Sequence, residues 1–317
     1  MEFSCDRKEL LKHVSLLART APAESSVPAM TGILMEADAE NLELTLTATD
    51  SVSALRLRCD AAVRKAGRAV VNAQMLCACL SRSSSSLIKL SVTPSRIVIQ
   101  AEQNRMELPI LPAEQFPNME LLLEEDAPAQ LTEKDWPALL SVPLFCTKAE
   151  AEDWSAPTGC LSLSARDGLL RGVCCDGNQL FTIQRPCEGS AAFSALLPMN
   201  PISRLSGLIH GEELTLHMTR RCVQFRKQNF LYAILRHHRD YFPVDAVIHS
   251  LSGVYSAVVE TKALHTALEC AAAIGASLTN LSITGNGIVL HPLSKSAAVV
   301  LPPIPAAECR PTSQSGF

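Results

Sequence analysis

Two adjacent cysteines, Cys174 and Cys175, are the residues of this sequence best suited by type to covalent catalysis. A cysteine nucleophile needs an electropositive setting or a neighbouring base that stabilises its thiolate. Four residues could supply that base: His210, His217, His237 and His238. The cysteine pair instead adjoins Asp176 inside an apolar, strand-like segment, and no motif places a histidine beside it. We therefore expect no catalytic residue and a protein that is not an enzyme.

The cysteines also lack the spacing of a metal site. They stand at positions 5, 59, 77, 79, 146, 160, 174, 175, 187, 222, 270 and 309, with no Cys-x-x-Cys and no histidine at zinc-ligand spacing. The glycines of "ITGNGIVL" precede no P-loop lysine, so a hairpin turn at Asn286-Gly287 explains them better than a phosphate-binding loop. We expect thiols that act as small hydrophobes, no metal and no cofactor.

Composition and charge indicate a globular protein of more than one domain. The chain has 317 residues, of which 47% are hydrophobic and 19% charged, and its formal net charge is −4. That charge argues against binding nucleic acid by bulk electrostatics but is compatible with a local basic face. No apolar run reaches the ~18 residues that span a bilayer, and Asp6 and Arg7 interrupt any signal-like segment at the N-terminus. We expect a cytoplasmic protein without membrane association.

An internal repeat with an offset of 126 residues organises the sequence. Phe116-Pro117 recurs as Phe242-Pro243, and Thr49-Asp50 recurs as Cys175-Asp176. Several coincidences at one spacing indicate duplicated structural units. A third copy begins near residue 256, where "YSAVVETKALHTALECAAAI" predicts a strand followed by a helix at about 261 to 274, but too few residues remain to complete it. The predicted domains are residues 1–122, residues 127–250 and a partial third domain at 254–317.

Each full copy divides into two halves, each of one strand, one helix and about three strands. Apolar residues recur at helical spacing at Leu10, Leu11, Val14 and Leu17. Alternating segments such as "LELTLTATD" and "RIVIQA" predict half-buried antiparallel strands.

The segment "LPILPAEQFPNM" closes the first copy. Pro117 and Pro243 are each predicted to end a strand, because proline cannot donate to the strand ladder and favours extended geometry in the residue before it. Phe116 and Phe242 are predicted to hold the connection against the following domain.

Several motifs together resemble those of the bacterial DNA polymerase III beta subunit family, the replicative sliding clamps. They are "LPAEQFP" (111–117), "DGNQL" (176–180), "LPMNPISRL" (197–205), "FP" (242–243) and "AAVVLPP" (297–303). The resemblance covers residues 1–250 and, in patches, the remainder. It implies an α+β DNA clamp fold of repeated domains, each with two β-α-β-β-β halves, helices inside and antiparallel sheets outside.

The function that this resemblance implies is that of a homodimeric ring around duplex DNA. Such a clamp is a non-catalytic processivity factor for DNA replication that encircles DNA without regard to sequence. It tethers the DNA polymerase through a short peptide bound in a cleft between its second and third domains. The implied partners are duplex DNA, the alpha subunit of DNA polymerase III, the clamp loader and a second copy of the chain.

The resemblance also implies a set of residues that bind the partner peptide. The family motif Thr-Asp-Gly-His-Arg-Leu reads Cys-Asp-Gly-Asn-Gln-Leu here, so a charged donor is missing and peptide binding would rely more on apolar contact. The predicted cleft residues are Cys175, Gly177, Asn178, Gln179, Leu180, Pro243, Val247, Val299, Leu301 and Pro302.

Basic residues on the predicted helices are the candidates for facing DNA. They are Lys8, Lys12, Arg19, Arg82, Lys134, Lys148 and Arg204. The loops beside two of these helices depart from the family, because "PAESSVPAM" carries Glu24 and "KAEAEDW" carries Glu150, Glu152 and Asp153.

Ring closure is implied to use Met106 of one subunit against Ala273 and Ile274 of the other. The shortened third copy leaves an alternative open: a clamp paralogue that does not close a ring and acts as a peptide-binding interaction protein.

Overall fold

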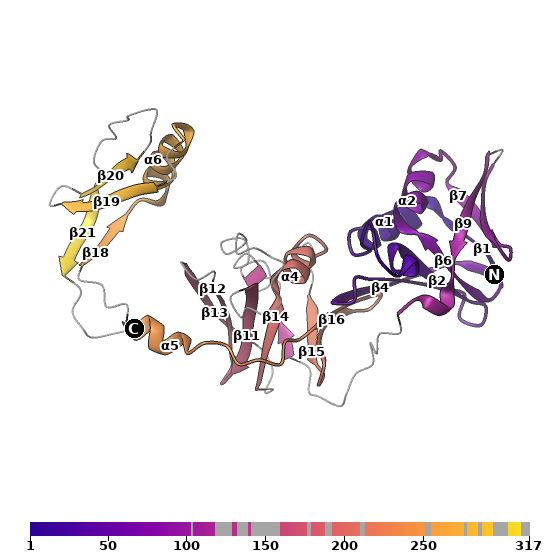
Figure 1. Cartoon of the computed structure of the whole chain (residues 1–317), viewed down its shortest axis with the longest axis horizontal. Helices are drawn as coiled ribbons and strands as arrows, with labels where there is room; N and C mark the ends of the chain where they lie inside the picture. Colours follow the sequence, from indigo (N-terminus) through magenta and orange to yellow (C-terminus); the bar gives the residue numbers. More distant parts are fainter. Residues whose placement is uncertain are drawn as a thin grey trace. The chain divides into compact units, whose positions relative to one another are not determined.

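The computed structural model describes residues 1–102, 104–117, 129–131, 139–140, 159–175, 179–187, 192–209, 213–250, 255–275, 278–284, 287–293 and 304–311. The chain forms two compact units, Met1–Tyr241 and Phe242–Phe317, which are described separately (Figure 1). No helix in the described part of the chain is long and apolar enough to cross a membrane.

The first copy of the repeat contains both predicted strand-helix-strand halves. Its first half comprises β1 (Glu2–Asp6), α1 (Arg7–Leu17), the short 3-10 helix η1 (Pro28–Thr31), β2 (Gly32–Asp38), β3 (Glu43–Thr49) and β4 (Ser53–Asp60). Its second half comprises the short β5 (Ala62–Lys65), then β6 (Gly67–Asn72), α2 (Ala73–Arg82), β7 (Leu87–Val92), β8 (Arg96–Ala101), β9 (Asn104–Leu111) and the 3-10 helix η2 (Ala113–Gln115).

Both helices of the first copy begin at a side-chain cap. The Asp6 carboxylate accepts a hydrogen bond from the Glu9 backbone N–H at 2.9 Å, and the Asn72 side chain accepts one from the Met75 N–H at 3.0 Å. Each helix then buries one apolar side against the sheet: Leu10, Val14 and Leu17 on α1, and Ala73, Leu76 and Leu80 on α2. The predicted apolar spacing of α1 is confirmed, with Leu11 only partly buried.

The described elements of the second copy follow the order of those in the first. It comprises β10 (Ala129–Leu131), β11 (Cys160–Arg166), β12 (Leu169–Cys175), β13 (Leu180–Pro186), β14 (Phe193–Pro198), α4 (Met199–Ser206), β15 (Leu214–Met218), β16 (Cys222–Lys227) and β17 (Phe230–Leu235). Five pairs of elements begin 126 residues apart, namely β3 with β12, β6 with β14, α2 with α4, β8 with β16, and β9 with β17. The predicted repeat is therefore confirmed.

A strand pairing joins the two copies. β17 of the second copy pairs antiparallel with β4 of the first, with Leu231 opposite Arg56. This pairing makes one 13-stranded sheet in the order β10-β15-β16-β17-β4-β3-β2-β6-β9-β8-β7-β1-β5. A second sheet of the second copy has the order β13-β12-β11-β14.

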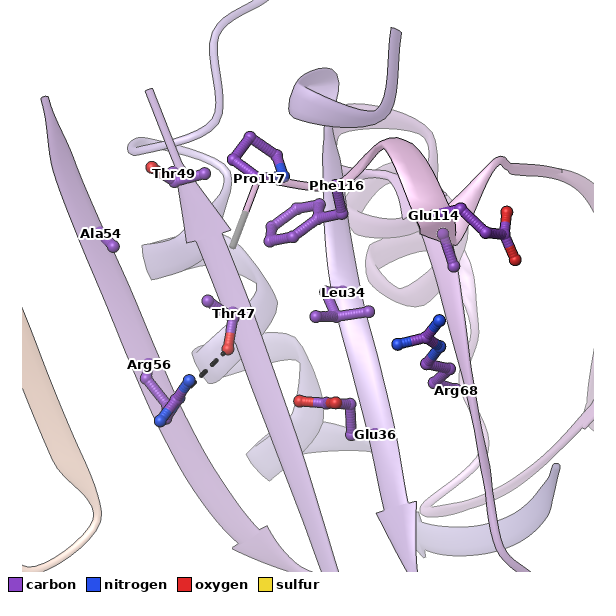
Figure 2. A pocket seen from close by; sticks show the side chains of 11 residues that line it. Leu34, Glu36, Thr47, Thr49, Ala54, Arg56, Arg68, Glu114, Phe116 and Pro117 are labelled. Carbon is purple, nitrogen blue, oxygen red and sulfur yellow. Dashed lines mark hydrogen bonds between the residues drawn. The ribbon is translucent and has the colours of Figure 1, made fainter. Parts of the chain in front are cut away.

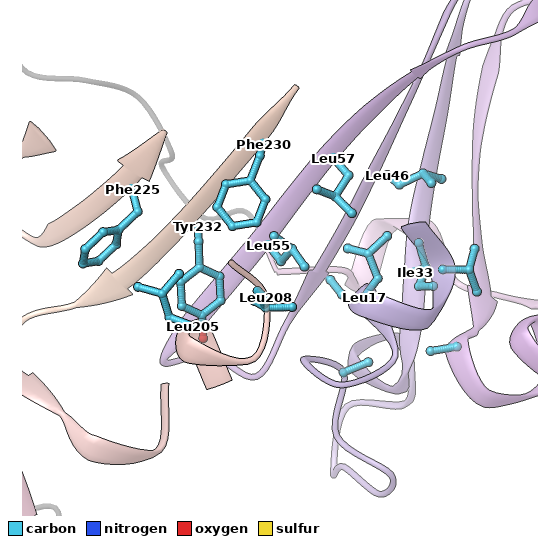
Figure 3. Packing of buried hydrophobic residues seen from close by; sticks show 14 of the residues in the cluster. Leu17, Ile33, Leu46, Leu55, Leu57, Leu205, Leu208, Phe225, Phe230 and Tyr232 are labelled. Atoms are coloured by element: carbon cyan, nitrogen blue, oxygen red, sulfur yellow. The ribbon is translucent and has the colours of Figure 1, made fainter. Parts of the chain in front are cut away.

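The hydrophobic core is continuous across this seam. Figure 3 shows Phe230 and Tyr232 of β17 beside Leu55 and Leu57 of β4, all of them buried. The Tyr232 hydroxyl donates a hydrogen bond to the Pro201 carbonyl at 3.0 Å, which links the strand to α4. The first two copies are thus held together by shared apolar burial as well as by backbone hydrogen bonds.

The second unit is smaller. It contains α5 (Val244–Ser250), β18 (Tyr255–Val259), α6 (Thr261–Ala273), β19 (Leu278–Thr284), β20 (Gly287–Leu293) and β21 (Ala306–Pro311). Its small core of Ile288, Leu290 and Ile304 packs against residues that include Leu264 of α6. The predicted strand and helix of the third copy are therefore confirmed.

Gly287 belongs to strand β20 rather than to the hairpin turn predicted at Asn286-Gly287. It pairs with Thr284 of β19, and Asn286 lies outside the described residues. Gly287 has a φ of 126°, and a Cβ at this position would collide with the Ile304 carbonyl oxygen. Glycine is needed here because the backbone passes so close to residue 304.

The prolines of the repeated motif do not end strands as predicted. β9 already ends at Leu111, before Pro112, and Pro243 lies just before α5 rather than after a strand. Phe116 folds back over the outer face of the first copy's own sheet (Figure 2). After η2, Phe116 lines a cavity on the first copy's own sheet, and its predicted packing against the following domain stays a prediction.

The domain boundaries stay a prediction. The structure places Phe242 and α5 in the second compact unit, whereas the predicted second domain extended to residue 250. The predicted boundary near residues 122–127 lies outside the described residues.

Candidate nucleic-acid and peptide-binding surfaces

The helices of the first copy carry exposed basic residues. Lys8 and Lys12 on α1 are exposed and stand four residues apart, so both point to the side of the helix away from Leu10 and Val14. Arg82, the last residue of α2, is also exposed. α1 and α2 lie side by side over one face of the sheet (Figure 1). This arrangement presents positive charge on the helical side of the first copy.

Two other predicted DNA-facing residues lie where α4 of the second copy approaches the first copy. Arg19 follows α1, and its Nη1 donates to the Gly207 carbonyl at 3.3 Å. Arg204 on α4 is largely buried, and its Nη1 lies 2.7 Å from Oδ2 of Asp50 and 3.1 Å from the Ser53 hydroxyl. These contacts hold the side chain of Arg204 inside the protein, although its predicted DNA-facing role stays a prediction. Lys134 and Lys148 lie outside the described residues.

The predicted peptide-binding residues of the first unit lie at one end of the β12–β13 pair. Cys175 is directly opposite Leu180 in that antiparallel pair, and both are partly buried, while Gln179 is exposed. The structure therefore brings Cys175 and Leu180 together. Gly177 and Asn178 lie outside the described residues.

In the second unit, the predicted peptide-binding residues lie on or next to α5. The Val247 N–H donates to the Pro243 carbonyl at 3.1 Å, so the two residues are one helical turn apart. Pro243 is exposed and Val247 is partly buried. Val299, Leu301 and Pro302 lie outside the described residues, so the predicted cleft stays a prediction.

The predicted dimer residues lie near open strand edges. Met106 lies on β9, whose residues 104–109 pair with β8 on one side and, among the described residues, with no strand on the other. Ala273 is exposed at the end of α6, and Ile274, the helix C-cap, is partly buried. β19, the next strand, pairs only with β20 within the described residues and exposes Leu281 and Ile283.

Cys174, one of the two thiols considered for catalysis, and several other thiols are buried. Cys174 is fully buried, and its Sγ lies 3.9 Å from the Met199 sulfur. Burial raises the pKa of Cys5 and Cys59 to about 12 and that of Cys160 to about 11, so these groups are neutral thiols at pH 7. Within the described ranges, no three histidine, cysteine or acidic side chains gather as a metal site.

The outer face of the sheet, opposite the helices, carries two neighbouring cavities that sequence analysis did not find. The larger, of about 350 Å³, lies over β2, β3 and β4 and is lined at one end by Leu34, Phe116 and Pro117 (Figure 2). Arg56 also lines this cavity, and its Nε donates to the Thr47 hydroxyl at 3.5 Å.

The smaller cavity, of about 190 Å³, lies across the seam between β4 and β17. It is lined by Arg56, Arg58, Arg226, Lys227, Gln228, Asn229, Phe230 and Leu231. The only hint in the sequence was basic residues at alternating positions, as in "LRLR", because the cluster combines residues from two copies of the repeat.

Comparison with known proteins identifies relatives of this chain. Residues 1–120 match the family described as "DNA polymerase III beta subunit, N-terminal domain". The beta sliding clamp of Pseudomonas putida is 24% identical over 218 residues, which cover 67% of this chain and 58% of that protein. The beta sliding clamp of Halalkalibacterium halodurans is 24% identical over 308 residues, which cover 91% of this chain and 80% of that protein.

Solved structures of beta subunits share the fold. A putative DNA polymerase III beta subunit from Eubacterium rectale has a TM-score of 0.89 at 16% identity, covering 98% of this chain and 86% of that one. The Helicobacter pylori beta clamp bound to a DNA ligase peptide has a TM-score of 0.81 at 14% identity, covering 98% and 87%. The α+β clamp fold predicted from the sequence is confirmed.

Proposed function

We propose that the protein is a DNA sliding clamp, because its residues 1–120 match the N-terminal domain of the DNA polymerase III beta subunit family. It acts as a non-catalytic processivity factor that keeps a DNA polymerase on duplex DNA during replication. The family match over residues 1–120 is the observation that carries this proposal. The exposed Lys8, Lys12 and Arg82 support it, because they provide a local basic face on a chain whose net charge is −4.

The proposed clamp encircles DNA as a homodimer. Within the part of the chain that the structure describes, two strand edges have no partner strand, one along β9 at Met106 and one along β19 in the second unit, and they support this assembly. Unpaired strand edges with exposed apolar residues favour pairing with another chain. Met106 of one subunit docks near Ala273 and Ile274 of the other, and the two sheets extend one another.

The proposed partners are the alpha subunit of DNA polymerase III and the clamp loader, in the cytoplasm. They bind through a short peptide that contacts the family-implied cleft residues, including Leu180 and Val247. The peptide-bound Helicobacter pylori clamp supports a peptide-binding role for the same fold. Since Gln179 stands where the family has a basic residue, the peptide is held mainly by apolar contacts.

The proposal is tested by topological retention on DNA. The protein is assembled on a closed circular duplex, and half of the sample is then linearised. A sliding clamp stays on the circle and runs off the linear form, whereas electrostatic binding is equal on both. Solution mass is measured across a range of protein concentrations in parallel, because a dimer with a modest interface dissociates on dilution.

A second candidate function is a clamp paralogue that does not close a ring. Among the described residues of the second unit, the buried members of its hydrophobic cluster are Ile288, Leu290 and Ile304, and this limited core favours the second function. A stable homodimer interface buries well over ~1,000 Å² in total. A monomer at all concentrations, with equal loss from circular and linear DNA, assigns the protein to this second function.

A further inference from the structure

The smaller outer-face cavity concentrates positive charge on an acidic protein. Four of its lining residues are cationic, Arg56, Arg58, Arg226 and Lys227, and none of its lining residues is acidic. The chain as a whole carries a net charge of −4. Such a local excess of positive charge, on the face opposite the helices, attracts an anionic group.

Two acidic residues, Glu43 and Glu36, lie beside these cationic groups. Glu43 contacts Arg58 at 3.6 Å between Oε1 and Nε, in a pair that is partly exposed. Burial lowers the pKa of Arg56, and the negative charge of the nearby Glu36 opposes this shift. Burial also lowers the pKa of Arg226, and the charges of Arg56 and Arg58 lower it further. An anion bound among these guanidinium groups would relieve their mutual repulsion.

Strand register connects the charged cavity to the apolar end of the larger one. Arg226 lies opposite Leu231, Leu231 opposite Arg56, Arg56 opposite Thr47, and Thr47 opposite Leu34. Residues paired across strands point to the same face of a sheet, so these five form one row across the outer face. Arg56 lines both cavities, so they adjoin one another.

The length of this row specifies a ligand length. Arg226 and Leu34 are four strand spacings apart, which is roughly 19 Å at ~4.8 Å per strand, or about six residues of extended chain. A ligand that fills both cavities must therefore carry an anionic group at one end and an apolar group about six residues away. Phe116 and Pro117 would cover the apolar group (Figure 2).

We propose that this outer face, from Arg226 to Phe116, binds an acidic peptide segment of a partner protein. The acidic side chains enter the cavity at the β4–β17 seam, and an apolar side chain packs against Leu34 and Phe116. A peptide fits better than a nucleic acid, because Glu36 and Glu114 offset Arg56 and Arg68 in the lining of the larger cavity, which therefore lacks the continuous positive charge that a phosphodiester backbone needs. This site is separate from the helical face and from the family-implied peptide cleft.

Binding of a labelled peptide to the full chain tests the proposal. The probe is a fluorescent twelve-residue peptide with one phenylalanine near its N-terminus and a Glu-Asp-Glu triplet six positions later. Its control peptide has Gln-Asn-Gln in place of the triplet. We expect saturable binding of the acidic peptide, at least about tenfold weaker binding of the control, and loss of binding as salt is raised.

Two matched lysine variants locate the binding site. Lys227→Glu and Lys89→Glu each reverse one exposed charge on a strand of the same sheet, but only Lys227 lines the charged cavity. We expect Lys227→Glu to weaken peptide binding at least about tenfold and Lys89→Glu to change it less than about twofold. Phe116→Ala is expected to weaken binding several-fold without changing its salt dependence.

Three results would overturn the proposal: no binding of the acidic peptide, equal effects of the two lysine variants, or displacement of the peptide by short duplex DNA but not by excess unlabelled peptide. The last result would assign the surface to nucleic acid. Retention on circular DNA is measured separately with Lys227→Glu, which should leave it unchanged, so failure of this site is distinct from failure of the clamp function.

Discussion

The guanidinium of Arg204 on α4 lies 2.7 Å from the carboxylate of Asp50, which follows β3. The pair joins a helix of the second copy to a loop of the first. Asp50 also accepts hydrogen bonds from the Val52 and Ser53 N–H groups, at 3.0 and 2.7 Å, so its charge is held in place on both sides. The side chains are 24% and 17% exposed, which makes the pair far less screened than a surface ion pair.

Removing this ion pair should destabilise the junction between the copies. Arg204→Gln leaves the Asp50 carboxylate partly buried without its cation, and we expect a loss of about 1–3 kcal/mol in the free energy of unfolding. Urea denaturation measures it. Arg64→Gln is the matched control, because Arg64 pairs with Glu2 on the surface and is 82% exposed. Arg64→Gln should lower the free energy of unfolding by less than about 1 kcal/mol. Equal losses of unfolding free energy in the two variants would contradict the structural role of Arg204.

Buried thiols should make the protein less stable in alkali. The pKa of Cys5 and of Cys59 is raised from 9.0 to about 12, chiefly by burial. The unfolded chain therefore releases these protons first, so the stability they contribute is complete below pH 9 and is lost as pH rises towards 12. Each thiol adds a slope of up to about 1.4 kcal/mol per pH unit.

A cysteine variant isolates this effect. Cys59→Ala should reduce the fall in unfolding free energy between pH 9 and pH 11, whereas Cys270→Ala, at an exposed position of α6, should leave it unchanged. Denaturation curves at three pH values provide the measurement. An unaltered slope in Cys59→Ala would show that other groups cause the alkaline loss.

Gly287 should be required for the fold of the second unit. Gly287→Ala places a methyl group on the Ile304 carbonyl, and the hydrogen bonds between Ile288 and Ile304 should break. Gly275→Ala is the control that separates the steric collision from the strain of a positive φ. Gly275 also has a positive φ, 71°, but no atom lies within 4 Å of a Cβ added there. Hydrogen exchange at Ile288 should accelerate in Gly287→Ala only. Similar acceleration in both variants would attribute the effect to φ alone.

Leu180 should contribute to binding of a clamp-type peptide. We expect Leu180→Ala to weaken binding by about 1–2 kcal/mol with little change in stability, because a partly buried leucine at a strand start contributes more contact than core volume. Leu169→Ala is the control, since Leu169 is an exposed leucine at the start of the paired strand β12. A titration with equal affinities for the wild type and both variants would remove Leu180 from the peptide site.

Local patterns in the sequence determined which elements form and that they repeat. Asp6 and the apolar spacing of α1 specify a capped helix with one buried side, and alternation specifies half-buried strands such as β3. These features depend on residues within a few positions of one another, so they can be read along the chain. The offset of 126 residues was equally visible, because each copy encodes the same elements in the same order.

Only the tertiary structure decided which parts of the two copies meet. The register of β17 on β4 sets Leu231 opposite Arg56 and completes the cationic cavity with Arg226. The sequence predicts that Arg204 is an exposed helix residue. In the structure, the packing of α4 places its guanidinium in an ion pair with Asp50. Contacts of this kind join residues that are far apart in the sequence. The choice of which strands pair depends on the apolar burial of the whole sheet, and the pattern of one segment does not reveal it.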